Sequence, residues 1–571
     1  MQGECPSEVR DAFLEMLGSW GSAPLPKAPA WPSALTDDHT PFAFSVALGG
    51  PTPELHVVVE ALGPNPSFAS NAAAGLALNQ ALAKRGADLS RFEKVKDLFL
   101  PNESSAGFAI WHTATFAPGK APSYGVVLNP QVRGAEWAYA VAEEAMDRLG
   151  FMRVWPCVTD VAHRCTPRDE MRYVSLSLSN ELRLDVHVYH HEATVADLER
   201  SASTTPGYAA GAVTEFCAAM AGGEGPIVKP FATRITFAEG KSAPVSSRLE
   251  IPIRFFTEHD RAARERIRAY LERKGLPVSQ YDQVLEAAAR RPLEGGKGLQ
   301  ASVSLDLETR RRFTVQLAPE AFQVTPAGAP DLREPPLPSP EEIVRTYEKH
   351  SIANHPFFQH ARRNAVDVSI LWMLQMNIRE GIVRNFTRRL ANVVARTDDV
   401  RIRSILAKQL NDELGDGDAS RAHALLFDNF INGLDSFRPA VVPKDLVEPG
   451  NELSRRLEDI YVKRDAFEGI GAAMVIEIIG KQGDTFMGDE FRRQKAIHKS
   501  IPPVALEWLT IHEELELEHS GESMELAELV PADPKAIALA WRGARDCGAA
   551  CWTVLDGMYK LCYGPEAAPQ R

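Results

Sequence analysis

The sequence predicts a two-domain α+β protein, with an N-terminal ten-stranded antiparallel β-barrel ringed by helices and a C-terminal all-α helical bundle. Before residue 324, short runs that alternate apolar and polar side chains occur in pairs separated by helical stretches, which is typical of half-buried strands. After residue 340, apolar residues recur at helical spacing instead. The proline-dense segment between these halves predicts a semi-rigid linker. We therefore expect domains at residues 1–324 and 341–571, joined by residues 325–340.

The strand-like runs of the first domain form five pairs, each compatible with a hairpin. Ten antiparallel strands can close into a barrel, and closure leaves no exposed sheet edge. Helices between the pairs then cover the outside of the barrel. The strands are expected at residues 42–49, 54–62, 107–116, 123–128, 172–178, 182–190, 233–238, 247–256, 299–307 and 312–318. The helices are expected at residues 70–84, 134–149, 206–221, 261–274 and 278–289.

The second domain begins with a helix start signal. Ser339 can cap the helix, Pro340 suits its first position, and Glu342 completes a capping box. The roughly 230 residues that follow are enough for a domain to bury its own core. Helices are expected at residues 341–349, 361–396, 400–414, 420–432, 452–479, 502–519 and 534–563.

Composition and charge argue against several classes of protein. The 571 residues carry 63 Lys and Arg against 76 Asp and Glu, so the formal net charge is −13. An acidic chain without a basic tract is a poor nucleic-acid binder. We find no apolar stretch of about 18 residues that would span a membrane and no secretory signal at the start. The seven scattered cysteines are expected to be free thiols, and the expected location is the cytoplasm.

The sharpest chemical motif lies near the C-terminus. On a helix, His512, Glu516 and His519 stand at positions i, i+4 and i+7, so one face carries two imidazoles and a carboxylate. These nitrogen and oxygen ligands suit a first-row metal, iron in particular. The alternative is a solvated acidic helix with two incidental histidines.

Two further parts of the helical domain offer ligands of the same kinds. Glu413 ends one predicted helix and His423 begins the next, and the glycine-containing break between them lets both side chains enter one space. Glu477 lies in a helix that is apolar nearly all round, where a lone carboxylate is costly unless a cation contacts it. The alternatives are a polar loop for the first pair and a buried salt bridge for Glu477.

These six side chains come from four helices of one bundle, as carboxylate-bridged di-iron sites require. The C-terminal half, about residues 340–565, resembles the heme-oxygenase-like di-iron oxidases, which carry a Glu…His pair, a mid-helix Glu and a terminal His-xxx-Asp/Glu-xx-His. Glu516 stands where Asp is more usual. The metal ligands that the resemblance implies are Glu413, His423, Glu477, His512, Glu516 and His519.

The same resemblance implies the cofactors, which are two Fe²⁺ ions that activate O₂. It assigns no catalytic residue beyond the metal ligands. Some members of the family have one more carboxylate ligand, for which Glu380 is a candidate. An ion pair with Arg384, four residues later on the helix, is the favoured explanation of that glutamate.

The first half, about residues 8–324, resembles the aromatic prenyltransferase (ABBA) barrel of the bacterial relatives of tryptophan dimethylallyltransferases. The resemblance rests on residues 38–47, 128–134, 251–254 and 317–322. It implies lysines and arginines that hold a diphosphate, tyrosines that shield an allyl cation, and a glutamate that takes the indole proton.

Most of these family positions are changed in this sequence. The glutamate position is Ala43, and only Arg183 survives of an Arg-x-Lys-x-Tyr strand. A diphosphate of about −3 charge needs several nearby cations, whereas Asp185 and Glu250 would repel it. We therefore expect a barrel that is inactive as a transferase. Further changed positions are His56, Gly125, Val127, His187, Ser302 and Gln316.

The two halves together predict a non-heme di-iron oxidase or oxygenase of specialised metabolism, fused to a degenerate prenyltransferase barrel. The expected substrate is a small aromatic molecule, indole- or tryptophan-derived and in one version prenylated. The expected reaction is an oxidative side-chain modification such as C–C cleavage, N-oxygenation or desaturation. Two alternatives stay open, an active indole prenyltransferase with a helical accessory domain and a non-catalytic partner of a separate prenyltransferase. A homodimer and a complex with such a partner are the assemblies considered.

Overall fold

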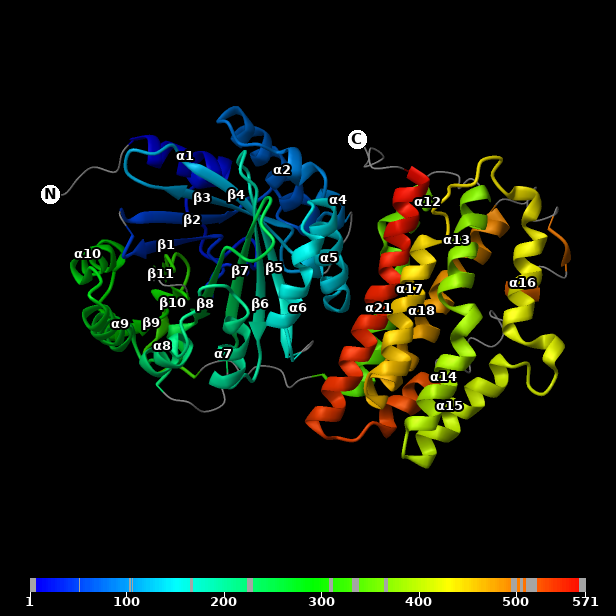
Figure 1. Cartoon of the computed structure of the whole chain (residues 1–571). Coiled ribbons are helices and arrows are strands. Elements are labelled where there is room, and N and C mark those ends of the chain that lie inside the picture. Colours follow the sequence, from blue (N-terminus) through cyan, green and yellow to red (C-terminus); the bar gives the residue numbers. More distant parts are fainter. Residues whose placement is uncertain are drawn as a thin grey trace. The chain divides into compact units, whose positions relative to one another are not determined.

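The structure is a computed structural model in which the chain divides into two compact units (Figure 1). One unit is formed mainly by residues before 337 and the other mainly by residues after it. The residues that the structure describes are 7–50, 52–101, 104, 106–164, 168–222, 229–307, 312–330, 338–363, 368–493, 501–503, 507–509 and 521–563.

Ten antiparallel strands close into a barrel in the first unit, which confirms the predicted fold class of this half. The strands are β1 (Phe42–Leu48), β2 (Glu54–Glu60), β3 (Ile110–Phe116), β4 (Ser123–Leu128), β5 (Asp169–Ser177), β6 (Arg183–His190), β7 (Phe231–Ala238), β8 (Ser246–Ile251), β10 (Gln300–Asp306) and β11 (Phe313–Leu317). Their order around the barrel is β1-β11-β10-β8-β7-β6-β5-β4-β3-β2. Alternate residues of each strand face the lumen, because successive side chains of a strand point to opposite faces.

Helices cover the outer face of this barrel (Figure 1). Outward side chains of β1, β8, β10 and β11 join the helices α7 to α10 in one continuous apolar core. The helices are α1 (Ser7–Leu17), α2 (Phe68–Lys84), α3 (Ser90–Glu93), α4 (Lys96–Phe99), α5 (Ala138–Arg148), α6 (Trp155–Val161), α7 (Val195–Ser203), α8 (Ala212–Met220), α9 (Asp260–Lys274) and α10 (Val278–Ala288).

Three sequence expectations for this unit are wrong in detail. The helix expected at 206–221 begins only at α8, because Gly207 and Gly211 adopt positive φ angles of 80° and 79° that a helix cannot use. The strand expected at 247–256 ends at Ile251, because Pro252 lacks the N–H that would extend the ladder. The predicted linker opens with a strand, β12 (Thr325–Pro326), which pairs with β9 (Gly296–Lys297).

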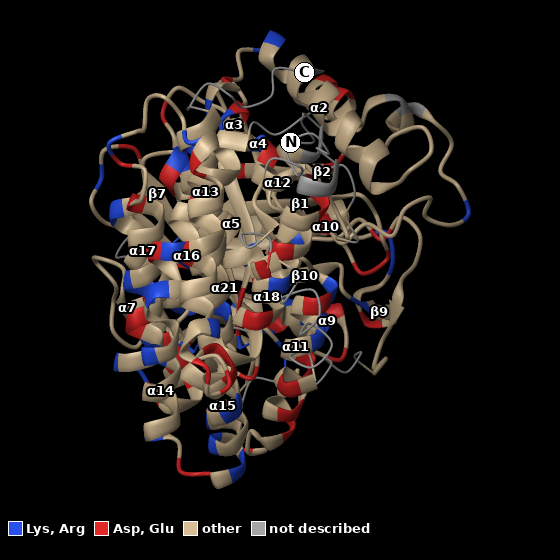
Figure 2. Ribbon diagram, turned by 90° about the vertical axis from the view of Figure 1, so that its right-hand side faces the viewer, with Lys and Arg blue, Asp and Glu red and all other residues tan. Residues whose placement is uncertain are grey.

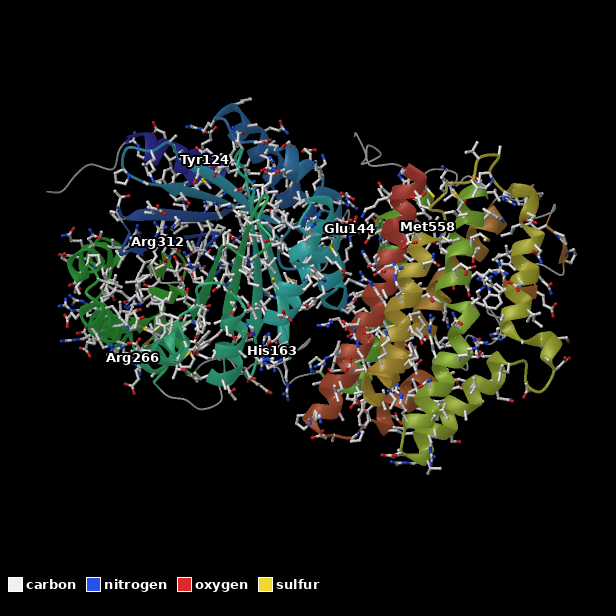
Figure 3. The ribbon with its side chains drawn as sticks, in the orientation of Figure 1. Tyr124, Glu144, His163, Arg266, Arg312 and Met558 are labelled. Atoms are coloured by element: carbon white, nitrogen blue, oxygen red, sulfur yellow. The ribbon has the colours of Figure 1, made fainter. Side chains whose placement is uncertain are left out.

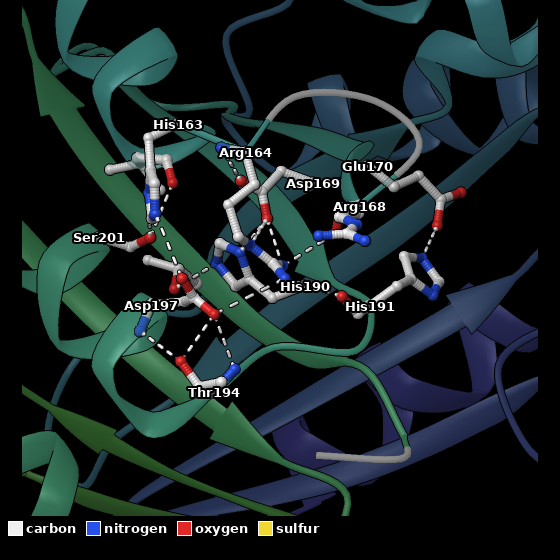
Figure 4. A network of polar contacts seen from close by, with 12 residues as sticks. His163, Arg164, Arg168, Asp169, Glu170, His190, His191, Thr194, Asp197 and Ser201 are labelled. Atoms are coloured by element: carbon white, nitrogen blue, oxygen red, sulfur yellow. Dashed lines mark hydrogen bonds and ion pairs between the residues drawn. The ribbon is translucent and has the colours of Figure 1, made fainter. Parts of the chain in front are cut away.

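A buried polar network ties β5, β6 and β7 together (Figure 4). Asp169 accepts hydrogen bonds from Arg164 Nη2 at 2.6 Å and from His190 Nδ1 at 2.8 Å. The other ring nitrogen of His190 lies 2.9 Å from the Thr233 hydroxyl. Burial alone would raise the pKa of Asp169, but contact with His190 and Arg164 outweighs it and lowers the pKa to about 2. The network is closed to solvent and therefore supports the barrel rather than chemistry.

The second unit is helical, as predicted, and its helices run side by side (Figure 1). They are α11 (Pro340–Lys349), α12 (Pro356–Arg363), α13 (Val368–Gly381), α14 (Phe386–Arg396), α15 (Val400–Glu413), α16 (His423–Gly433), α17 (Glu448–Glu458), α18 (Ala466–Arg493) and α21 (Pro534–Tyr563). The helix expected at 502–519 falls mostly outside the described residues. Basic and acidic residues both occur on outer helices such as α15 (Figure 2).

Two helices that the sequence predicted as continuous are interrupted. The stretch expected at 361–396 breaks between α13 and α14, where the buried Arg389 guanidinium donates to the Gly381 carbonyl at 2.8 Å. That bond satisfies a carbonyl that the helix would otherwise have bonded. The stretch expected at 452–479 becomes α17, a π-helical segment at Asp459–Lys463, and a separate α18.

Close backbone contacts fix the long helices. An added Cβ at Gly471 on α18 would lie 1.9 Å from the Ala540 carbonyl oxygen on α21, and one at Gly543 would lie 1.8 Å from that of Glu468. Only glycine permits this approach. Asn377 joins α13 to α21 through its amide, which lies 3.1 Å from the sulfur of Met558 (labelled in Figure 3).

Among the described residues, no helix combines the length and the apolarity that a membrane span needs. The described cysteines, Cys157, Cys217, Cys547, Cys551 and Cys562, are free thiols, as expected.

Candidate functional site

The helical unit encloses a cavity of about 510 Å³ between α13, α15, α16, α18 and α21. Its walls are mostly aliphatic and aromatic, and include Leu374, Ile378, Phe427, Ile476, Phe486 and Leu555. Among the described residues, five carboxyl groups line the same space, those of Glu348, Glu413, Glu477, Asp484 and Asp489. An apolar cavity with a few convergent polar groups is the usual form of a small-molecule site.

The structure brings Glu413 and His423 together, as the sequence predicted. Gly415 and Gly417, with φ angles of 91° and 85°, turn the chain sharply between α15 and α16. His423 Nδ1 then lies 2.9 Å from Glu413 Oε1, and the imidazole is buried. This bond uses Nδ1, so Nε2 would be the nitrogen that binds a metal ion in the predicted ligand role. The ring of Trp508 packs edge-on against the imidazole, with centroids 5.7 Å apart.

Glu477 lies in the middle of α18 and lines this cavity, as its predicted role requires. Seven residues later on the same face, Asp484 also lines the cavity, and the sequence reasoning missed it. Burial and, to a smaller extent, the Glu477 carboxylate raise the pKa of Asp484 to about 7, although Trp508 and His423 act against the rise. The i, i+7 spacing of Glu477 and Asp484 was the signal that could have found it.

The remaining three predicted ligands, His512, Glu516 and His519, lie outside the described residues. Within the described ranges, no group of three or more His, Cys, Asp and Glu side chains is close enough to hold a metal ion. The chemistry of the described donors nevertheless fits iron, because carboxylate oxygens and an imidazole nitrogen suit it. Glu413, Glu477 and Asp484 line one cavity, where a cation would offset their negative charge.

Glu380 takes the alternative role considered from the sequence. Its carboxylate accepts from Arg384 Nη1 at 2.6 Å, four residues further along the chain. It does not line the cavity as Ile378 and Ile382 do.

The barrel lumen is a second cavity, of about 800 Å³. Positions expected to face the lumen do so, namely His56, Gly125, Val127, Arg183, Asp185, His187, Glu250, Ser302 and Gln316. The arginines Arg234, Arg248 and Arg312 also line the lumen. Each is paired with a carboxylate, in the pairs Arg234–Asp185 at 2.7 Å, Arg248–Asp306 at 2.6 Å and Arg312–Glu54 at 2.8 Å. Arg312 is labelled in Figure 3.

Aromatic side chains gather in another part of the lumen lining. The ring of Tyr173 lies 5.2 Å from that of Trp111 and 5.8 Å from that of Tyr189. His187 completes this group, 5.8 Å from Tyr173, and burial lowers the pKa of His187 to about 3. The imidazole is therefore neutral at physiological pH, and the group offers flat, uncharged surfaces to a ligand.

The family model described as an iron-containing redox enzyme matches residues 379–552. The range includes Glu413, His423 and Glu477, and also the cavity-lining Asp484. The match assigns iron-dependent redox chemistry to the helical unit at the level of the family.

The N-terminal region resembles solved prenyltransferase structures. The 6-dimethylallyltryptophan synthase from Micromonospora olivasterospora, in complex with DMASPP and Trp, is 35% identical with a TM-score of 0.54, over 57% of this chain and 94% of that one. The 5-dimethylallyl tryptophan synthase from Streptomyces coelicolor, also with DMASPP and Trp, is 29% identical with a TM-score of 0.52, over 58% and 94%. PriB with L-tryptophan is 27% identical with a TM-score of 0.52, over 59% and 95%.

These comparisons agree with the architecture of both units. The closed ten-stranded barrel accounts for the structural matches, and the helical unit contains the redox-family region. The chain therefore belongs to the tryptophan prenyltransferase barrel family in its N-terminal region and carries a heme-oxygenase-like, iron-containing redox enzyme domain in its C-terminal region.

Proposed function

We propose that the helical unit is a non-heme di-iron oxidase or oxygenase that uses O₂ to oxidise a small aromatic substrate. One observation carries the proposal. Glu413 and Glu477 line one apolar cavity, His423 is bonded to Glu413, and all three lie in the region that the redox family matches. In this proposal His512, Glu516 and His519 complete the ligand set.

Each described side chain then has a definite task. Glu413 holds Nδ1 of His423 at 2.9 Å and so fixes the orientation of the ring. Iron, when bound, supplies the activation of O₂. The apolar walls exclude water and hold the substrate beside Glu477.

The proposed substrate is an indole- or tryptophan-derived molecule, and the proposed reaction is an oxidative side-chain modification such as C–C cleavage, N-oxygenation or desaturation. The cavity supports an aromatic substrate because Phe427, Phe486 and Trp508 line it. The barrel relatives that were solved with Trp support the indole class.

We further propose that the barrel does not transfer a prenyl group. Three of its lumen arginines, Arg234, Arg248 and Arg312, are already paired with carboxylates, so a diphosphate would have to compete with these carboxylates. Glu250 lines the same lumen and adds negative charge.

Iron content tests the oxidase proposal. The full chain is loaded with Fe²⁺ without oxygen, freed of excess metal, and analysed for iron and for O₂ consumption with indole. We expect about two ions per chain, as in carboxylate-bridged di-iron proteins. His423→Ala and Glu477→Gln should each lose iron and O₂ consumption. Asp428→Asn, which only breaks a half-buried pair with Arg379, should lose neither.

Less than half an ion per chain in folded parent protein would refute the proposal. The barrel proposal has its own test, incubation of the full chain with dimethylallyl diphosphate and L-tryptophan. We expect no prenylated product, and turnover would overturn the proposal and favour the active prenyltransferase considered from the sequence.

A further inference from the structure

Two glutamines line the cavity of the helical unit, and their amides are used differently. Gln482 is committed to the backbone, because its Nε2 donates to the Tyr347 carbonyl at 2.8 Å and its Oε1 accepts from the Ile352 N–H at 2.9 Å. Gln375 on α13 also lines the cavity and is only 3% exposed. Within the described part of the chain, the Gln375 amide forms no hydrogen bond.

An unpaired buried amide is costly and therefore rare in a native protein. Gln375 lines a cavity, so a ligand in that cavity can supply the missing partner. The neighbouring wall residues on the same helix, Leu374 and Ile378, are aliphatic. Gln375 is thus an isolated polar group in an otherwise apolar stretch of wall.

The charges around the cavity indicate what such a ligand carries. Glu413, Glu477 and Asp484 line it, whereas Lys481 is the single basic residue among the described lining residues. A carboxylate or phosphate group would meet repulsion here. Acidic surroundings favour a ligand that donates a hydrogen bond over one that only accepts.

We propose that Gln375 is the specificity-determining residue of this cavity and that its Oε1 accepts a hydrogen bond from the N–H of an uncharged, flat, otherwise apolar part of the substrate, as in an indole ring. The inference rests on the proposed function, because it takes the cavity to be the substrate site. It adds that Gln375 recognises the substrate and that the N–H of the substrate is the group it binds.

Binding to the metal-free full chain tests the inference without relying on oxidation. Indole and benzofuran have the same shape, but an oxygen replaces the N–H in benzofuran. We expect calorimetric titration to show about tenfold tighter binding of indole, the effect of one buried hydrogen bond. Gln375→Met should abolish this preference. Gln409→Met should keep it, because Gln409 is a buried glutamine of α15 that does not line the cavity.

Thermal unfolding gives a second readout. Gln375→Met should unfold at the same temperature as the parent or higher, because it removes an unpaired amide. Equal binding of the two probes, a preference that survives Gln375→Met, or a lowered unfolding temperature of this variant would each overturn the inference. Iron uptake separates the two hypotheses, since normal uptake without an indole preference refutes only the role of Gln375, and absent uptake refutes the oxidase.

Discussion

Glu60 is a carboxyl group in the wall of the barrel, and its replacement by glutamine measures the cost of burying it. The residue is 1% exposed. Its carboxylate accepts hydrogen bonds from Trp31 Nε1 at 2.9 Å and from Ser33 Oγ at 2.6 Å. Burial raises the pKa of Glu60 from 4.5 to about 7, although these hydrogen bonds act against the rise.

The sign of the effect follows from linkage. A raised pKa means that, at pH values between the two pKa values, Glu60 still holds its proton in the folded chain but has lost it in the unfolded chain. The free energy of unfolding therefore falls as the pH rises from 4.5 to 7, and it is insensitive to Glu60 outside that range. The rise from 4.5 to about 7 corresponds to about 3 kcal/mol. Glu60→Gln cannot ionise and should escape this loss.

The assay is pulse proteolysis in urea at pH 5 and pH 8, with barrel fragments identified by mass spectrometry. The stability of Glu60→Gln relative to the parent should increase by about 2–3 kcal/mol between these pH values. Glu239→Gln is the control, because Glu239 forms an exposed pair with Arg91. A difference between Glu60→Gln and the parent that stays constant with pH would refute the reasoning.

Two further substitutions probe other buried contacts. Asp169→Asn should destabilise the barrel by about 3–5 kcal/mol, because it leaves the Arg164 charge without its carboxylate. The parent itself should lose stability in acid as the pH falls from 3.8 towards 2, where Asp169 takes up its proton, and acid titration of barrel unfolding checks this. Gly471→Ala should destabilise the helical unit by about 1–3 kcal/mol, because its Cβ would overlap the Ala540 carbonyl oxygen, while barrel unfolding stays unchanged in the same proteolysis assay.

The barrel could be predicted because the patterns that specify its strands lie within short stretches of the sequence. Strict alternation in runs such as β6 (Arg183–His190) reports that one face is buried, and paired runs report hairpins. The helix α1 was missed, although Phe13 packs against Phe42 and Phe44 with ring centroids 5.6 and 5.4 Å away. That contact joins residues that are distant in sequence, and no local pattern of residues predicts it.

The interruptions of the long helices depend on tertiary partners in the same way. Nothing near Gly381 reveals that Arg389 will bond its carbonyl, since the bond exists only once the chain has turned. In the candidate site, Glu413 and His423 were found because a glycine turn is a local signal. Asp484 stands seven residues after Glu477, which is a local signal, but its proximity to His423 arises only from the packing of α16 and α18.

The glycine contacts between α18 and α21 also bear on how this protein can change over evolution. Gly471 lies six residues before Glu477, and it anchors α18 to the main chain of α21 rather than to any side chain. The position of Glu477 along the axis of α18 and the direction in which it points are therefore set by a backbone contact between α18 and α21. Mutation of the cavity wall leaves this contact intact. In the proposed oxidase, residues such as Leu374 and Ile378 can then change in size and admit new substrates while the carboxylate stays in place.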